Sequence, residues 1–215
     1  MQAVAELVPP GARVIDVGTD HAMIPVWLAQ TGRAAHIWAA DLREGPLRGA
    51  QALIDETGTG DLIELRLTDG LCGFTAADGD TVIIAGMGGE TMISILSAAE
   101  WTRENTLLIL EPQSKQAELR RFLTENGYCI RREQLVKDAG KLYPILTVNG
   151  GRSPAYTAAE LHTGRFGQIM DEPLFCEYLA ALKKRAADAA PYDENAAVLL
   201  CEYQTMEERW MQCRQ

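Results

Sequence analysis

The stretch that decides the fold class is Val14-Ile15-Asp16-Val17-Gly18-Thr19-Asp20-His21-Ala22. Its first half is a short apolar run, and Arg13–Val17 is predicted to form a buried β-strand. Gly18 then supplies a tight turn with a carboxylate on either side. A glycine turn directly after a first buried strand is where Rossmann-like α/β folds bind a cofactor.

The same alternation of strand and helix continues downstream of this stretch. Short β-branched runs predict four more strands, at His36–Ala40, Ile63–Leu67, Thr81–Ala85 and Thr106–Leu110. Between the strands, helical patterns cover Ile24–Thr31, Pro46–Thr57, Thr91–Ala99 and Lys115–Asn126. Strands that alternate with helices of this length indicate βαβ units and a parallel sheet.

The alternation ends at Asn126-Gly127, a helix stop. Tyr128–Glu133 and Leu142–Val148 are expected to be two more strands, joined by a turn around Asp138-Ala139-Gly140. A terminal hairpin adds an antiparallel strand to an otherwise parallel sheet. Seven strands with this ending are typical of the methyltransferase variant of the doubly wound fold.

Residues 153–215 are predicted to be helical and to form a small domain of their own, after a first domain of residues 1–152. Pro173 and Pro191 are each placed to begin a helix. The two helices are expected to pack as an antiparallel hairpin. A structural buttress, a dimer contact and a substrate-binding arm all remain open as roles for it.

Composition excludes several classes of protein. The chain has 215 residues, of which 47% are hydrophobic, and a net charge of -10. No apolar run is long enough for a membrane span, and the N-terminus lacks the features of a signal peptide. The five cysteines form no CxxC pair, which argues against a disulfide framework or a structural zinc site and favours the cytoplasm.

The acidic turn favours one cofactor over another. A dinucleotide needs G-x-G-x-x-G so that the backbone can approach a pyrophosphate. Here a single glycine, Gly18, lies between Asp16 and Asp20, whose charges would repel a pyrophosphate. The same carboxylates suit the sulfonium and ammonium groups of S-adenosylmethionine. Asp16 could instead serve as a turn or cap carboxylate.

Further residues at the ends of strands extend this predicted site. Asp41 follows the second strand at the distance from Gly18 where an acid binds a ribose diol. Asp69-Gly70 follows the third strand, near the expected adenine ring. Gly86-Met87-Gly88-Gly89 closes the fourth, where glycines let the backbone approach a ligand. The predicted cofactor-binding residues are Asp16, Gly18, Asp20, His21, Asp41, Leu42, Asp69, Gly70, Gly86, Met87 and Gly88.

Taken together, the motifs DVGTDHAMIP, AADLREGPL, LTDGL, IAGMGGETM, LILEPQ and GKLYPIL make this chain resemble the bacterial tRNA (adenine-22-N1)-methyltransferase family. The resemblance covers residues 3 to 150, and the helical tail more loosely. It implies methyl transfer from S-adenosylmethionine to N1 of an adenine in the D-arm region of tRNA. It also implies a coiled-coil-like C-terminal domain that helps to hold the tRNA.

The chain departs from the family pattern in three places. The family usually begins with a helix containing Ser-x-Arg-Leu, and this chain starts part-way along it. The family has L-Q-P-N where this chain has Leu110-Glu111-Pro112-Gln113, and an acid where it has Pro144.

The catalytic candidates are Asp20 and Glu111, as acids near the target adenine, and His21 as a proton acceptor. His21 could equally make a structural hydrogen bond. The target base must be unpaired or flipped out, since N1 lies on its pairing edge, and Tyr143 could hold it. Residues 112–152 hold eight basic against four acidic residues, a balance that by itself is also typical of an ordinary solvated surface. The candidate tRNA contacts are Arg120, Arg121, Arg131, Arg132, Lys137 and Lys141.

Three alternatives stay open at this point. The acidic net charge favours a methyltransferase that acts on a small molecule or a protein. A module that binds the cofactor without chemistry is a second alternative. An oxidoreductase that uses NAD is the third, and it lacks the phosphate-binding glycines.

Overall fold

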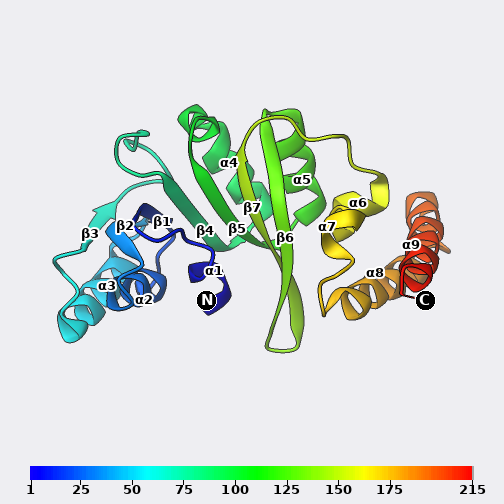
Figure 1. Cartoon of the computed structure of the whole chain (residues 1–215), viewed down its shortest axis with the longest axis horizontal. Helices are drawn as coiled ribbons and strands as arrows, with labels where there is room; N and C mark the ends of the chain where they lie inside the picture. The colour runs from blue at the N-terminus through cyan, green and yellow to red at the C-terminus, as the bar shows by residue number, and fades with distance from the viewer. Residues whose placement is uncertain (215) are drawn as a thin grey trace.

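The computed structural model describes residues 1–214. Its centre is a seven-stranded sheet with the order β3-β2-β1-β4-β5-β7-β6, flanked by helices on both faces (Figure 1). The strands β1 to β5 are parallel, and β7 pairs antiparallel with both β5 and β6. The strands are β1 (Ala12–Val17), β2 (Ala34–Asp41), β3 (Ile63–Leu67), β4 (Thr81–Gly88), β5 (Leu107–Ser114), β6 (Tyr128–Asp138) and β7 (Lys141–Gly150).

Helices cover the sheet and build the C-terminal extension. Those of the first part are α1 (Gln2–Ala5), α2 (Met23–Gln30), α3 (Glu44–Thr57), α4 (Gly89–Ser97), the 3-10 helix η1 (Glu100–Arg103) and α5 (Gln116–Glu125). Those of the extension are α6 (Ala158–Thr163), α7 (Phe166–Ile169), α8 (Phe175–Ala189) and α9 (Glu194–Gln212).

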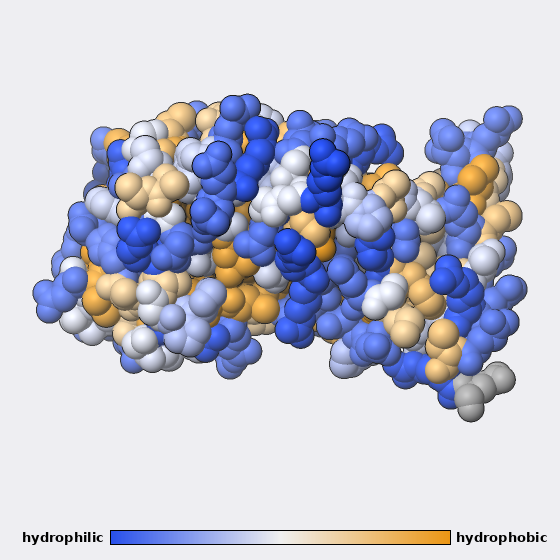
Figure 2. Space-filling model, turned by 45° about the horizontal axis from the view of Figure 1, so that its top comes forward, coloured by the Kyte–Doolittle hydropathy of each residue, from blue (hydrophilic) through white to orange (hydrophobic). Residues whose placement is uncertain are grey.

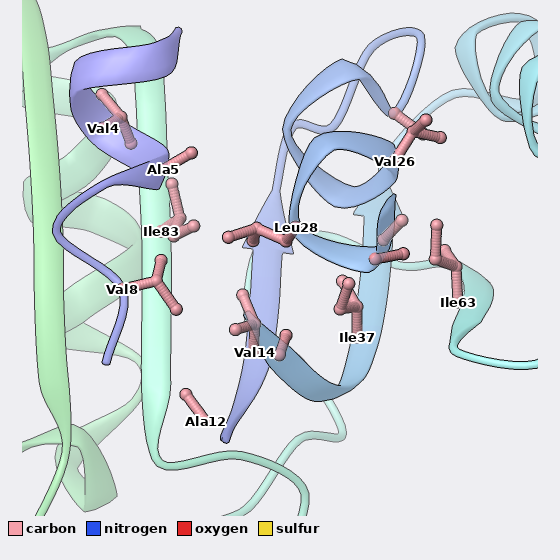
Figure 3. Packing of buried hydrophobic residues seen from close by; sticks show 14 of the residues in the cluster. Val4, Ala5, Val8, Ala12, Val14, Val26, Leu28, Ile37, Ile63 and Ile83 are labelled. Atoms are coloured by element: carbon pink, nitrogen blue, oxygen red, sulfur yellow. The ribbon is translucent and has the colours of Figure 1, made fainter. Parts of the chain in front are cut away.

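Two hydrophobic clusters sandwich the central strands. Val14 and Ile83 belong to the cluster beneath α1, α2 and α3, where Val4 and Val8 of the N-terminal segment also pack (Figure 3). The other cluster lies on the opposite face, against α4 and α5. Both faces of β1 and β4 are therefore buried. This explains why the sequences of these two strands are largely apolar and do not alternate with polar residues.

The alternating strands and helices predicted from the sequence are confirmed, but the terminal hairpin is longer than expected. β6 continues past Glu133 to Asp138, and β7 begins at Lys141. β5 pairs with β7 only over Leu108–Leu110, so the distal half of the hairpin extends beyond the sheet. Leu135 packs there against the C-terminal helices, and this burial stabilises the extra length.

The predicted helical hairpin is present as α8 and α9, which pack side by side (Figure 1). Its hydrophobic cluster includes Phe175, Tyr178, Tyr203 and Met206 and is separate from the two clusters of the sheet. The short helices α6 and α7 lie within the stretch predicted to be helical, but neither was predicted as a separate element. α6 begins with a capping box between Thr157 and Glu160, so the sequence did carry a local signal for it.

Hydrophilic residues predominate on the face seen in Figure 2, and hydrophobic ones reach the surface there in small groups. Within residues 1–214, no helix combines the length and the apolar character needed to cross a membrane.

Candidate cofactor and active site

Two adjoining cavities lie where the parallel strands end. The larger, of about 690 Å³, is called the central cavity, and Asp16, Asp20 and Glu111 are among the residues that line it. The smaller, of about 220 Å³, is called the edge cavity and is lined by residues that follow β2, β3 and β4. Gly18 lines both cavities. The site therefore lies at the carboxyl ends of the strands, where doubly wound sheets bind ligands.

Asp16 is the buried charge of this site. The residue is 4% exposed, and burial raises the pKa of its carboxyl from 3.8 to about 6; the nearby Thr19 side chain opposes this rise, and the charge of Asp41 adds to it. The structure records no Lys or Arg within ion-pair distance of Asp16 among the described residues. A buried carboxylate without a counter-charge favours a ligand that brings a positive charge.

Glycine is required at two positions around this carboxylate. Gly18 has φ +74°, and a Cβ there would collide with Cε of Met87. Gly86 has φ +76°, and a Cβ there would meet no atom within 4 Å. Both backbones adopt the left-handed region that favours glycine, and the space beside Gly86 is open to a ligand.

The edge cavity suits a nucleoside. The Asp41 carboxylate is buried at its wall, and its Oδ1 accepts a hydrogen bond of 2.9 Å from the backbone N–H of Arg43, at the start of α3. Among the described residues only Oδ1 is engaged, which leaves Oδ2 for a ribose hydroxyl. Leu42, Asp69 and Gly70 line the same cavity.

Glu111 also lines the central cavity and is 8% exposed. Its Oε2 accepts a hydrogen bond of 2.9 Å from the backbone N–H of Gly86, and Nε2 of Gln113 donates to Oε1 at 2.9 Å. Burial raises the pKa of Glu111, although these two hydrogen bonds oppose the rise. The side chain is therefore held in one orientation beside Gly86.

The remaining predicted site residues differ in how far they are exposed to solvent and in which cavity they line. Asp20 and His21 line the central cavity at its rim, with side chains 69% and 63% exposed, and Nε2 of His21 lies 3.8 Å from Oδ1 of Asp20. Met87 lines the edge cavity. Gly88 lies outside the lining of both cavities, at the N-cap of α4. Of the three catalytic candidates, only Glu111 is buried.

Sequence reasoning missed some residues of the central cavity. Thr19 is 7% exposed, and its hydroxyl, which lies near the Asp16 carboxyl, makes no hydrogen bond of good geometry among residues 1–214. It lines the central cavity and so offers an unused polar atom to a ligand. Gln113 was missed as well, although its place two residues after Glu111 at the end of β5 could have indicated it. Tyr143 lines the cavity too, as expected.

An S-adenosylmethionine molecule fits this arrangement. The buried, unpaired charge of Asp16 suits its ammonium and sulfonium groups, Asp41 suits its ribose, and the Thr19 hydroxyl lacks a partner. Among residues 1–214 no group of three or more His, Cys, Asp or Glu side chains is placed to hold a metal ion.

The structure corrects one predicted tRNA contact. Arg120 is fully buried, and its Nη2 lies 2.7 Å from Oε2 of the equally buried Glu133. Its Nη1 donates to the backbone carbonyls of Leu161 and His162. Arg120 therefore anchors α6 to α5. The prediction that Arg120 contacts tRNA is wrong, because an arginine that turned outward to the RNA would leave the Glu133 carboxylate buried without a partner, which is costly.

The other basic candidates are on the surface. Arg121, Arg131, Arg132, Lys137 and Lys141 are all exposed, and Lys137 forms an ion pair with Glu177 at 2.6 Å.

Comparisons with known proteins show the family to which the chain belongs. Residues 1–146 match the model of a methyltransferase domain family. The chain is 31% identical over 166 residues to a tRNA (adenine(22)-N(1))-methyltransferase of Bacillus subtilis, covering 76% of this chain and 70% of that protein. A crystal structure of a candidate tRNA (m1A22) methyltransferase from Streptococcus pneumoniae is similar, with a TM-score of 0.85, 30% identity and 96% of both chains covered.

A second crystal structure of the Streptococcus pneumoniae protein, in complex with S-adenosyl-L-methionine, is also similar. It gives a TM-score of 0.81 and 32% identity, and again 96% of both chains is covered.

Proposed function

The chain belongs to the tRNA (adenine(22)-N(1))-methyltransferase family, and we propose that it transfers a methyl group from S-adenosylmethionine to N1 of an adenine in tRNA, at position 22 in the D-arm region. The single observation that supports this most strongly is the unpaired buried carboxylate of Asp16 beside the open backbone of Gly86. A cationic methyl donor matches that charge, whereas a pyrophosphate would be repelled.

The cofactor-binding residues are divided between the two cavities. Asp16, Thr19 and Gly18 hold the charged amino-acid end in the central cavity, and Asp41 binds the ribose diol. Leu42, Asp69 and Gly70 enclose the adenine of the cofactor in the edge cavity. When bound, S-adenosylmethionine supplies an electrophilic methyl group.

Glu111 is the residue that acts on the target base. Adenine N1 carries a lone pair and needs no prior deprotonation, so orientation is the main catalytic task. Methylation at N1 leaves a positive charge on the purine, and the fixed, buried Glu111 carboxylate stabilises that charge. It can also accept a proton from the exocyclic amine. Asp20 and His21 lie at the rim of the central cavity, where both side chains face solvent.

The surface residues Arg121, Arg131, Arg132, Lys137 and Lys141 contact the tRNA backbone in this proposal. In this proposal the chain divides near residue 152 into the cofactor-binding domain and the helical domain, whose hydrophobic cluster also includes Leu135 of β6. A tRNA substrate implies a cytoplasmic protein.

Labelled S-adenosylmethionine and tRNA transcripts test this proposal. We expect N1-methyladenosine after digestion of the wild-type tRNA product, and none from a transcript with guanine at position 22. Label in the mutant transcript would refute the position, and label in no RNA at all, with cofactor binding intact, would refute the substrate class.

A further inference from the structure

A third cavity, called the hairpin cleft, adjoins the central cavity, and of the residues given a role in the function proposed above only Lys141 lines it. Its volume is about 720 Å³, and it lies between the tip of the β6–β7 hairpin and the helices α8 and α9. Gln113 and Tyr143 line both the hairpin cleft and the central cavity. A ligand that extends from the central cavity would therefore enter the cleft.

The cleft carries aromatic and polar side chains deep inside it. Tyr178 and Tyr203 line it, and the Tyr178 hydroxyl donates to the carbonyl of His162 at 3.0 Å. The Tyr203 hydroxyl has no hydrogen-bond partner among the described residues, although Tyr203 is only 2% exposed. Burial raises the pKa of Tyr203, so its hydroxyl stays protonated and can donate.

His162 is a second side chain of the cleft that can form hydrogen bonds with a nucleobase. Burial, together with the charge of Arg120, lowers the pKa of His162. The neutral imidazole then offers one donor and one acceptor. Neutral rings and hydroxyls in a cleft suit a nucleobase, which proteins recognise in single strands by stacking and by hydrogen bonds to its edges.

The rim of the cleft is basic in a chain whose net charge is -10. Lys115, Lys141 and Arg185 line it, against Glu177 as its one acidic lining residue among those described. Lys115 forms ion pairs with Glu118 and Glu90. Lys141 and Arg185 have no ion-pair partner among residues 1–214, which leaves two cations for phosphate groups.

The tip of the hairpin separates the two cavities. Ala139 and Gly140 form a two-residue turn with φ +44° and +79°. Such a turn twists in the same sense as its strands and keeps the hairpin narrow. The tip lies between α1 on one side and α8 on the other (Figure 1), and it contributes Lys137 and Asp138 to the central cavity but Gly140 and Lys141 to the cleft.

We propose that the hairpin cleft binds a nucleotide next to the target adenine, so that the hairpin tip holds the two bases apart. This proposal rests on the proposed function and specifies how its RNA is held. A base whose N1 reacts must leave its stack. Placing its neighbour on the other side of a protein wedge prevents the two bases from restacking.

Two neighbouring residues of α8 provide a matched test. Arg185 lines the cleft, whereas the exposed Lys184 does not. The dissociation constant of a fluorescent tRNA transcript is measured with S-adenosylhomocysteine present, across a range of salt, for the wild type and for Arg185→Glu, Lys141→Glu and Lys184→Glu. We expect the two cleft variants to bind about tenfold more weakly, with a salt slope lower by about 1, and Lys184→Glu to match the wild type.

A variant inside the cleft distinguishes a nucleotide site from general surface attraction. Tyr203→Phe removes only the unpartnered hydroxyl and leaves every charge in place. We expect a higher KM for tRNA, an unchanged salt slope and unchanged binding of S-adenosylhomocysteine.

The outcomes separate this inference from the function on which it rests. Wild-type protein that methylates tRNA while Arg185→Glu binds it as Lys184→Glu does would overturn the cleft alone, and normal binding by Lys141→Glu as well would also remove Lys141 from the proposed tRNA contacts. Unchanged KM in Tyr203→Phe would overturn the base contact. Wild-type protein that neither binds nor methylates tRNA would overturn the proposed function and the cleft together.

Discussion

Replacing Asp16 with Asn should make the protein without cofactor more stable and at the same time abolish cofactor binding. Asp16 is buried with no basic partner among the described residues, and the wild type must bear an uncompensated charge there at neutral pH. Asn has nearly the same shape and no charge. The change therefore removes the cost of the buried charge together with the attraction for a cationic ligand.

The size of the effect follows from the pKa of Asp16. Its carboxyl titrates at about 6 in the folded protein against 3.8 as its ordinary value. A pKa shift of one unit corresponds to about 1.4 kcal/mol of free energy. The shift of Asp16 therefore means that its ionised carboxylate destabilises the folded state by at most about 3 kcal/mol. We expect Asp16→Asn to recover about 2 kcal/mol of the free energy of unfolding.

The raised pKa of Asp16 also determines the direction in which the stability of the protein changes with pH. Because the folded-state pKa is raised, the folded protein binds more protons than the unfolded chain between pH 3.8 and about 6. The contribution of Asp16 to the stability of the wild type thus falls as pH rises through this window and is constant above it. The stability difference between Asp16→Asn and the wild type should be near zero below pH 4 and reach its full size above pH 6.

The assay is urea unfolding at several pH values, with and without S-adenosylhomocysteine, and isothermal titration calorimetry for affinity. Asp61→Asn removes the same charge from an exposed position and serves as the control. For the wild type, cofactor affinity should fall about tenfold from pH 7 to pH 5 as Asp16 is protonated. A variant that binds cofactor as tightly as the wild type, or that loses stability above pH 6, would refute the assignment of Asp16.

Three other substitutions test separate parts of the site. Gly18→Ala places a Cβ against Met87 at positive φ, and calorimetry should show at least about tenfold weaker cofactor binding; normal affinity would exclude close approach of a ligand there. Arg120→Ala leaves Glu133 buried without its partner, and urea unfolding should show a loss of about 3–5 kcal/mol; a loss below about 1 kcal/mol would contradict the burial of this pair. Glu111→Gln should lower the single-turnover rate of methylation about 100-fold with cofactor affinity unchanged, and an unaltered rate would remove Glu111 from the chemistry.

The sequence was sufficient to predict the sheet, and it also led to the proposed cofactor side of the site, because both depend on local patterns. The apolar run of Val14–Val17 and the glycine turn after it predict a strand and a ligand-binding loop without any knowledge of distant contacts. Asp16, Gly18 and Asp41 follow from strand order alone, since the carboxyl ends of parallel strands meet at one edge of the sheet.

The sequence was less informative where a residue's role depends on what packs against it from far away. The sequence around Arg120 looks like that of an exposed arginine on a helix. Arg120 is buried only because Glu133 and α6 pack against it in the folded protein. The hairpin was predicted too short for a similar reason, because Leu135 is buried by helices that follow it by about forty residues. The cleft between hairpin and helices could not be predicted from either element alone.

The segment from β5 to β7 connects the chemistry to the RNA. It supplies Glu111 to the central cavity, and Gln113 and Tyr143 to the wall shared with the hairpin cleft. The same segment carries both members of the Arg120–Glu133 pair, which fix α6 and so the base of the helical hairpin. A buried ion pair is a weak source of stability but tolerates only one geometry. The position of the helical domain relative to Glu111 is thus set by a contact that permits little adjustment. A site that holds one nucleotide on each side of the hairpin requires such a fixed position.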